Sequence, residues 1–572
     1  MLSSFLIAKV LKNPPFRGGD ELVLLLTFEQ NKKRTMKKLF FTGYTPVVVL
    51  TLLFLVWACQ KDDPKPADPV PTLTFATPTA LSCSAGCSNV ATSSIPTGGT
   101  ISYSISDQSI ATINATTGAI TPVSAGAATV TATQAAMAGK NTQGVATYAL
   151  TIIGLSITSF APEFGGVGYT VVITGTQFDG ATAANNVVKI NGVQTATPTN
   201  VSSTSLTVLV PRGARGAGNI TVAVAGKTAT KGTFTEYATV TTFAGDGTQA
   251  WKDATGTAAQ FYTPAGLAFD NSGNLLVADY ANNRIRSITS AGVVSSIAGD
   301  GSYDYLNGQG TASETNQPWG IAVNKATGDI YFTDRGDDHI RKINSAGYVS
   351  SYAGSTEGNA NGTTLANAQF YQPQGIAIDG FNNIYVADRW NSLIRDLTSG
   401  GNVLTLAGNN TSGYANGNGA NAVFYFPDGL AIDPSGDNMY IADHTNNCIR
   451  KLVIQGSSDA STFAGSSVAD NGAGGFADGS GTGARFNGPS GLATDADGNL
   501  YVADNGNGLI RKITPAGVVT TVAGRPNLPD SDKYKDDLGP FCSIYQPLGI
   551  AVDALGDIYI TDGTNRIRKI VQ

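Results

Sequence analysis

Residues 264–286 read PAGLAFDNSGNLLVADYANNRIR, and residues 489–511 read PSGLATDADGNLYVADNGNGLIR. Both stretches contain Pro-x-Gly, a short apolar strand, a turn with glycine, a second strand ending in Asp, and a third strand ending in Ile-Arg. Six such copies follow one another between residues 240 and 572. A repeat of fixed length decides the architecture, because each copy is one supersecondary unit that packs on its neighbours.

The repeat length predicts the blades of a β-propeller. Its anchor residues are prolines (Pro264, Pro318, Pro373, Pro427, Pro489, Pro547), aspartates (Asp279, Asp334, Asp388, Asp443, Asp504, Asp562) and arginines (Arg286, Arg341, Arg395, Arg450, Arg511, Arg568). Successive aspartates lie 54 to 61 residues apart, which is room for four strands in each blade. We expect the aspartates and arginines to be structural, because every copy contains them.

Closure of the ring is also predicted. Each of the first five copies has a fourth strand, such as VVSSIAG at 293–299, but the last copy has none after Ile570. The segment VTTFAG at 240–245 precedes the first copy and has the pattern of the missing strand. We expect it to complete the last blade, so that no open sheet edge remains.

The motif Pro-x-Gly-(Ile/Leu)-Ala, then Tyr-Val-Ala-Asp, then Ile-Arg resembles the NHL repeat, and the resemblance covers residues 240–572. It implies a six-bladed propeller.

Two small β-domains are predicted before the propeller. Residues 72–153 contain alternating strands at 100–106 and 128–133, and the stretch 104–133 resembles the bacterial Ig-like group 2 domain. Residues 155–237 resemble the IPT/TIG domain, another Ig-like fold. The expected fold class is therefore all-β: two Ig-like β-sandwiches followed by a six-bladed propeller with a shared N- and C-terminal blade.

The N-terminal region has the pattern of an export signal. Within residues 1–58, Met36-Lys-Lys precedes an apolar run at 47–58, too short to span a membrane comfortably. Residues 1–35 carry no export pattern, and we interpret Met36 as the start. The segment LVWAC at 55–59 resembles a bacterial lipobox, although Trp57 departs from its usual small residue. This implies lipidation of Cys59, a Pro-rich tether at 59–71, and an outer-membrane protein exposed at the cell surface.

The remaining cysteines and the charge limit the function classes. Cys83 and Cys87 lie in an exported module and are candidates for a disulfide rather than a metal site. The net charge of −6 and pI near 5.1 argue against nucleic acid as a partner. With only His339 and His444, a three-histidine zinc site is impossible. We find no catalytic motif and predict no cofactor.

Residues that vary between copies are the candidates for binding. Two positions should ring the channel mouth: the middle of Pro-x-Gly and the residue after each strand-ending Asp. The predicted ligand-binding residues are Trp319, Trp390, Tyr280, Arg335, Arg389, His444, Gln374 and Asp428. Aromatic rings beside guanidinium groups suit a sugar ring or a peptide.

Three functions follow as hypotheses. The first is a surface binding module for an extracellular glycan, peptide or protein. The second is a metal-dependent propeller enzyme of the lyase or lactonase type, and the third is a purely structural adhesion protein.

Overall fold

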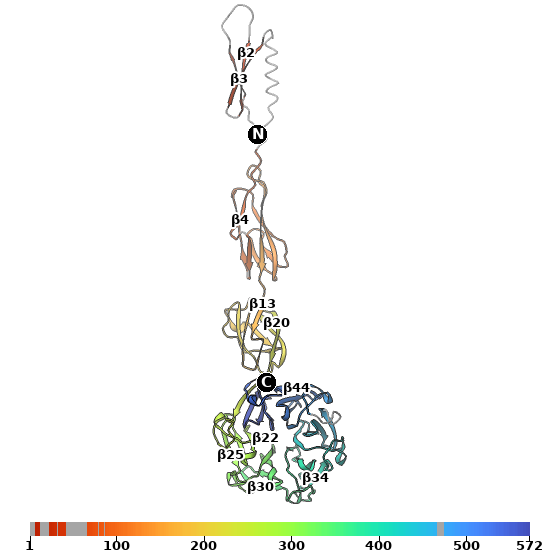
Figure 1. Cartoon of the computed structure of the whole chain (residues 1–572). Helices are drawn as coiled ribbons and strands as arrows, with labels where there is room; N and C mark the ends of the chain where they lie inside the picture. The colour runs from red at the N-terminus through yellow and green to blue at the C-terminus, as the bar shows by residue number, and fades with distance from the viewer. Residues whose placement is uncertain are drawn as a thin grey trace, which may run out of the picture. The chain divides into compact units, whose positions relative to one another are not determined.

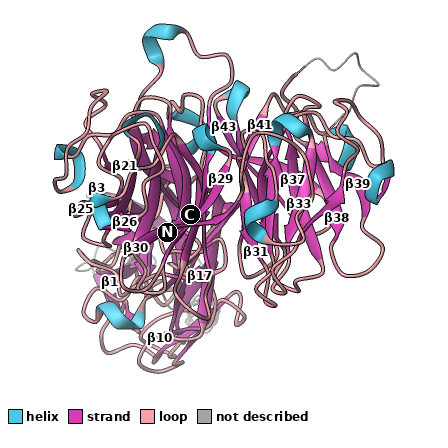
Figure 2. Cartoon of the chain, turned by 90° about the horizontal axis from the view of Figure 1, so that it is seen from below, coloured by secondary structure: helices cyan, strands magenta, loops and turns pink. Residues whose placement is uncertain are grey.

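The computed structural model describes residues 66–465 and 474–572, except Pro78 and Ala85, and the backbone of three strands before residue 42. The described part is built from strands, and its helical segments are 3-10 turns of three residues each (Figure 2). Contacts divide the chain into two compact units, Met1–Ile152 and Ile153–Gln572. The expected all-β fold is therefore confirmed.

The first strands form an antiparallel sheet in the order β1 (Leu6–Leu11), β2 (Leu22–Gln30) and β3 (Lys33–Phe41). The predicted apolar run at 47–58, the lipidation site Cys59 and most of the tether lie outside the described residues. Among the described residues, no helix has the length and apolar character needed to cross a membrane.

The next domain is a β-sandwich. One layer has the order β5 (Ala80–Cys83), β12 (Gly144–Ile152), β11 (Gly126–Gln134), β8 (Ile101–Ile105); the other elements are β6 (Cys87–Ser88), β10 (Ala119–Pro122), β9 (Ala111–Ile113) and the pair β4 (Leu73–Phe75), β7 (Ala91–Ser93). Alternate residues of β11 and β12 point inward, so Val130 and Leu150 are fully buried. A disulfide joins Cys83 to Cys87, at the end of β5 and the start of β6.

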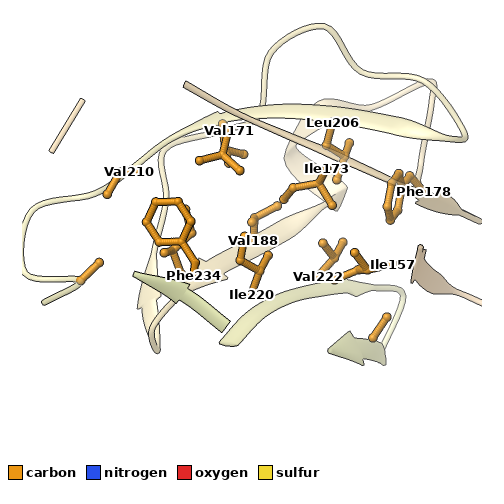
Figure 3. Close-up of a cluster of buried hydrophobic side chains, with 14 residues drawn as sticks. Ile157, Val171, Ile173, Phe178, Val188, Leu206, Val210, Ile220, Val222 and Phe234 are labelled. Atoms are coloured by element: carbon orange, nitrogen blue, oxygen red, sulfur yellow. The ribbon is translucent and has the colours of Figure 1, made fainter. Parts of the chain in front are cut away.

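The second sandwich opens the other compact unit. Its sheets have the orders β13 (Ser156–Ala161), β15 (Thr170–Thr176), β18 (Ser205–Leu209), and β14 (Phe164–Gly165), β20 (Lys227–Glu236), β19 (Gly216–Val224), β16 (Val187–Ile190), β17 (Val193–Gln194), with one turn η1 (Ala183–Asn185). Ile173, Ile220 and Phe234 meet between the sheets with no exposed surface (Figure 3). The alternating pattern of each strand produces this core.

Six sheets, each with four main strands, form the propeller, shown from yellow-green to blue in Figure 1. From the inner to the outer strand they are: blade 1, β22 (Pro264–Phe269), β23 (Leu275–Asp279), β24 (Arg284–Ile288), β25 (Val294–Ala298); blade 2, β27 (Pro318–Val323), β28 (Ile330–Asp334), β29 (His339–Ile343), β30 (Tyr348–Ala353); blade 3, β31 (Ile376–Ile378), β32 (Ile384–Asp388), β33 (Leu393–Leu397), β34 (Val403–Ala407); blade 4, β36 (Pro427–Ile432), β37 (Asn438–Asp443), β38 (Cys448–Val453), β39 (Asp459–Ala464); blade 5, β41 (Pro489–Thr494), β42 (Leu500–Asp504), β43 (Leu509–Ile513), β44 (Val518–Gly524); blade 6, β46 (Ile550–Val552), β47 (Ile558–Asp562), β48 (Arg566–Val571), β21 (Thr239–Ala244).

The sixth blade closes the ring as predicted. Strand β21 pairs antiparallel with β48, with Val240 opposite Ile570 and Ala244 opposite Ile567. Val240, Ile567 and Ile570 are buried, so the join is part of the core.

Close contact between neighbouring inner strands explains the glycine of Pro-x-Gly. A Cβ added to Gly375 would lie 2.0 Å from the carbonyl oxygen of Asp428 in the next blade. The same contact, at 2.0 to 2.3 Å, occurs in every blade, and Gly549 of blade 6 meets the carbonyl of Ala265 in blade 1. Any side chain here would push two blades apart.

The repeated Asp and Arg hold each blade to the long connection that precedes it. In blade 4, Arg450 Nη1 donates to Asp443 Oδ2 at 2.9 Å, and both side chains are fully buried. The other nitrogen, Nη2, donates to Ala415 O and Asn416 Oδ1 in the preceding connection. Burial raises the pKa of Asp443 to about 6, and Arg450 opposes the shift. The structural role of these pairs is thus confirmed.

The long connections between blades are partly sheet. Four of them add a fifth edge strand: β26 (Gly308–Gln309), β35 (Gly417–Asn418), β40 (Gly479–Ser480) and β45 (Asp537–Leu538). They also contain the turns η2 (Gly256–Ala258), η4 (Gly310–Ala312), η6 (Leu365–Asn367), η8 (Gly419–Asn421), η10 (Gly481–Gly483), η12 (Asp530–Asp532) and η13 (Gly539–Phe541). Much of each long loop therefore serves to cover the outer edge of a blade.

The second sandwich packs on blade 6. Arg212 donates to the buried carboxylate of Asp557 at 2.5 Å. Nearby, the rings of Phe164, Tyr237 and Phe541 contact one another with centroids 5.8 to 6.1 Å apart. Charge pairing and aromatic packing thus join this domain to the propeller.

Candidate functional site

The turns between second and third strands emerge on the same face of the propeller as the ends of the long connections. We call the residues on this face around the channel the mouth. The turns begin with 3-10 segments in four blades: η3 (Tyr280–Asn282), η5 (Arg335–Asp337), η7 (Arg389–Asn391) and η11 (Asn505–Asn507). The residue after each strand-ending Asp therefore lies at the first position of a tight turn.

Blades 1 and 2 bring three predicted residues together. The rings of Tyr280 and Trp319 meet edge to face with centroids 5.2 Å apart. The guanidinium of Arg335 lies 5.7 Å and 5.5 Å from these two ring centroids, and its Nη1 donates to the Tyr280 hydroxyl at 3.0 Å. Cation–π contact and this hydrogen bond hold the group as a unit.

Blades 3 and 4 bring the other four polar candidates together. Arg389 Nη1 donates to Gln374 Oε1 at 3.0 Å and lies 3.2 Å from Asp428 Oδ2. Nδ1 of His444 lies 4.0 Å from the same carboxylate oxygen and 3.2 Å from the carbonyl of Pro489. Burial lowers the pKa of His444, Arg389 adds to this, and Asp428 opposes it. The imidazole is therefore neutral at pH 7.

Trp390 belongs to a different cluster from Trp319. Its ring packs between those of Tyr371 and Phe426, with centroids 5.5 Å and 5.1 Å away, and Tyr425 follows at 5.0 Å from Phe426. We call these four residues the aromatic wall. Trp390 remains 45% exposed, so its ring is the part of this wall that solvent reaches most.

The rest of the mouth is small and neutral. Its positions are Ser490, Asn505, Leu548, Gly563 and Ala265. Ser490 donates to carbonyl oxygens of blade 6, and so does Asn505. At the two predicted repeat positions the mouth is therefore asymmetric, because the aromatic and charged residues at these positions lie on blades 1 to 4.

The central channel itself is narrow, and its lining exposes backbone polar groups as well as aliphatic side chains. The unfilled space, including open solvent at the mouth, is about 460 Å³ and is lined by glycines and aliphatic residues of the inner strands. Among the lining residues, Trp319 has the largest side chain and Asp428 is the acidic one. Within the described ranges, no group of three His, Cys, Asp or Glu side chains is arranged to hold a metal.

Backbone amides at the mouth are occupied by the scaffold. The residue before each repeated proline has a φ between +42° and +56°, which is costly in most side chains. Gln317 N donates to Asn283 Oδ1 and Gln372 N to Asp338 Oδ1, each on the preceding blade. These hydrogen bonds fix the Gln317 and Gln372 side chains beside Arg335.

A second concavity lies on the opposite face. It is lined by residues of blades 6, 1 and 2, including Phe243, Phe269, Tyr559 and Lys325, and its unfilled space, open solvent included, is about 970 Å³. It contains none of the predicted binding residues.

The sequence pattern found the mouth but missed part of it. Tyr371 and Tyr425 precede the repeated proline by two residues, and Gln317, Gln372 and Phe426 by one. These positions vary between copies just as the predicted ones do, and Tyr recurs at 262, 371, 425 and 545. The recurrence of Tyr two residues before the repeated proline could have identified these positions as part of the mouth.

Fold and sequence together define the class: two Ig-like domains joined to an NHL-type propeller. Family models match the IPT/TIG domain at 155–242, the bacterial Ig-like domain (group 2) at 77–145, and the NHL repeat at 261–286. The SMP-30/gluconolactonase/LRE-like region matches residues 303–529. The three resemblances seen in the sequence are thereby confirmed.

Known proteins share parts of this chain. SUPPRESSOR OF QUENCHING 1 of Arabidopsis thaliana is 33% identical over 284 residues, 47% of this chain and 26% of that protein. Human NHL repeat-containing protein 2 is 30% identical over 295 residues, 46% of this chain and 40% of that protein. The chain thus spans well under half the length of these relatives.

Among solved structures, an auxiliary nutrient binding protein from Bacteroides thetaiotaomicron aligns with 20% identity and a TM-score of 0.47, over 73% of this chain and 97% of that one. A gluconolactonase from Xanthomonas campestris aligns with 13% identity and a TM-score of 0.39, over 58% and 89%.

Proposed function

We propose that this chain is a lipid-anchored protein of the bacterial surface whose propeller mouth binds an extracellular glycan. The observation that carries the proposal is the aromatic wall beside a polar network. Trp390 exposes a flat ring that is suited to the apolar face of a sugar. Arg389, in the same two blades, is partly exposed and supplies donors for hydroxyl groups, and the buried side chains of Gln374 and Asp428 hold it in position.

The rigidity of the mouth supports binding. Interblade hydrogen bonds and glycine contacts hold the neighbouring turns in place, so little order must be gained when a ligand binds. Anchoring through Cys59 and the Pro-rich tether at 59–71 would present this face outside the cell.

Calorimetric titration of the purified chain with a panel of soluble polysaccharides tests the proposal. We expect measurable affinity for at least one glycan, and a loss of about tenfold or more in Trp390→Ala. Trp251→Ala is the matched control: Trp251 is 47% exposed, but it lies against Ser296 on the outer strand of blade 1. No binding to any glycan, or equal losses in both variants, would contradict the proposal.

A metal-dependent enzyme is the second candidate, favoured by the family match at 303–529. Elemental analysis of the purified chain distinguishes the two. A stoichiometric divalent cation that is lost in Asp428→Asn would favour the enzyme, because Asp428 is the carboxylate that lines the channel.

A further inference from the structure

Arg335 carries a charge that the mouth does not neutralise. Its Nη1 donates to Tyr280 and Gln317, and its Nη2 donates to Gln372 Oε1 at 2.6 Å. All three partners are uncharged, and no carboxylate of the described residues lies within 4.0 Å of its nitrogens. Its buried Nε has no hydrogen-bond partner. The guanidinium is thus held in place with its charge unpaired.

Arg389 provides the internal comparison. It occupies the same repeat position one blade further on, but Asp428 lies 3.2 Å from its Nη1. It also donates to Gln374, as Arg335 does to Gln372. The aromatic and amide partners of the two arginines differ as well, but the difference in charge is that Arg389 has a carboxylate partner within the protein and Arg335 does not.

We propose that Arg335 binds a carboxylate of the ligand, so that the glycan captured at the mouth is an acidic one containing uronic acid. This inference rests on the proposed function. The hydrogen bonds to Tyr280, Gln317 and Gln372 use both N–H groups of Nη1 and one of Nη2, so one N–H of Nη2 remains to donate a charge-assisted hydrogen bond to a carboxylate. An aromatic pair, Tyr280 and Trp319, lies against the guanidinium and limits its hydration.

The surroundings favour a sugar carboxylate over the carboxyl end of a peptide. Chain termini of peptides are commonly held by clusters of free backbone N–H groups. Here the amides of Gln317 and Gln372 are bound to side chains of the preceding blade, and that of Gly320 is bound to Thr333 Oγ1. What remains are side-chain amides, which pair readily with hydroxyl groups on a sugar ring.

The test compares two matched probes on the purified full chain: oligogalacturonate, and the same oligosaccharide with its carboxyl groups reduced to alcohols. We expect the charged probe to bind about 10- to 100-fold more tightly, as is usual for hydrogen bonds to charged groups. In Arg335→Gln this preference should disappear. Arg335→Lys should keep part of this preference, because the ammonium group retains the positive charge but lacks the planar guanidinium geometry.

Lys342→Gln is the control for loss of one positive charge in the same blade. Lys342 pairs with Asp329, in the turn between the first two strands, on the face opposite the mouth. Lys342→Gln should retain the full preference for the charged probe. Circular dichroism should show that Lys342→Gln and Arg335→Gln are both folded.

The outcomes separate this inference from the proposed function. Equal affinity for both probes, lost in Trp390→Ala, would overturn the carboxylate inference and leave glycan binding standing. A preference that survives Arg335→Gln would also overturn it. Binding of an acidic peptide through Arg335, without binding of either saccharide, would overturn both.

Discussion

The blade scaffold and the mouth are built from the same six repeats but behave in opposite ways. At the scaffold positions every blade has the same residues: the glycine against the next blade, and the buried Asp–Arg pair. At the middle position of Pro-x-Gly no two blades agree, from Trp319 in blade 2 to Leu548 in blade 6. The difference teaches that close packing allows only one residue type at a position. At an exposed position the residue type can vary, and it can therefore serve binding.

The largest expected effect comes from breaking a scaffold pair. Arg450→Ala leaves the carboxylate of Asp443 buried without its cation, and this should lower the free energy of unfolding by about 3–5 kcal/mol. Urea denaturation monitored by tryptophan fluorescence measures the change. Faster proteolysis within residues 409–426 should accompany it, because Arg450 also holds that connection. A loss below about 1 kcal/mol would show that the pair is dispensable.

A glycine substitution tests the contact between blades. In Gly375→Ala the new Cβ meets the Asp428 carbonyl, and overpacking of this kind costs about 1–3 kcal/mol. Gly380→Ala is the control in the same blade, since a Cβ there meets nothing within 4 Å. Thermal unfolding of both variants checks the prediction. Equal melting temperatures would mean that the ring relaxes without strain.

Blade 3 differs from blades 2 and 6 at the residue after the repeated Arg, and this allows a stabilising change. Lys342 and Lys569 pair with aspartates at 2.6 Å and 2.9 Å, but the equivalent residue in blade 3 is Asp396, near Asp379. Asp396→Lys should raise the free energy of unfolding at pH 7 by about 1 kcal/mol, because it replaces repulsion by attraction.

The same position predicts a pH dependence. Burial, with help from Asp379, raises the pKa of Asp396 to about 6 from its ordinary 3.8. The folded state then binds the proton more tightly than the unfolded state, so this stabilisation is complete below about pH 4 and is lost as the pH rises through 6. Melting temperatures of the wild type and Asp396→Asn, compared from pH 4 to 7, isolate the effect. Parallel profiles would contradict it.

The smallest effect on stability is expected at the mouth. Trp390→Ala removes an exposed ring, and the free energy of unfolding should fall by less than about 1 kcal/mol even though ligand binding is lost. Chemical denaturation of Trp390→Ala and Arg450→Ala under the same conditions compares the two losses in the free energy of unfolding. A loss as large as that of the scaffold variant would show that the aromatic wall is itself structural.

Much of the fold followed from the repeat. The six blades, the closure by residues 240–245 and the structural role of the Asp–Arg pairs were predicted, because each depends on a pattern repeated along the chain. The mouth positions were predicted for the same reason. Their grouping was not: Trp319 and Trp390 were both predicted as binding residues, and only the structure places them in separate clusters.

The sequence alone determined that this protein is an all-β chain of two Ig-like domains and a closed ring of blades, since strand periodicity and repetition are local signals. Only the tertiary structure decided which side chains meet. It paired Arg389 with Asp428 and left Arg335 among uncharged groups, although both arginines follow the same Asp of the repeat. The physical reason is that both arginines contact residues of neighbouring blades, which lie 37 to 55 positions away in the chain.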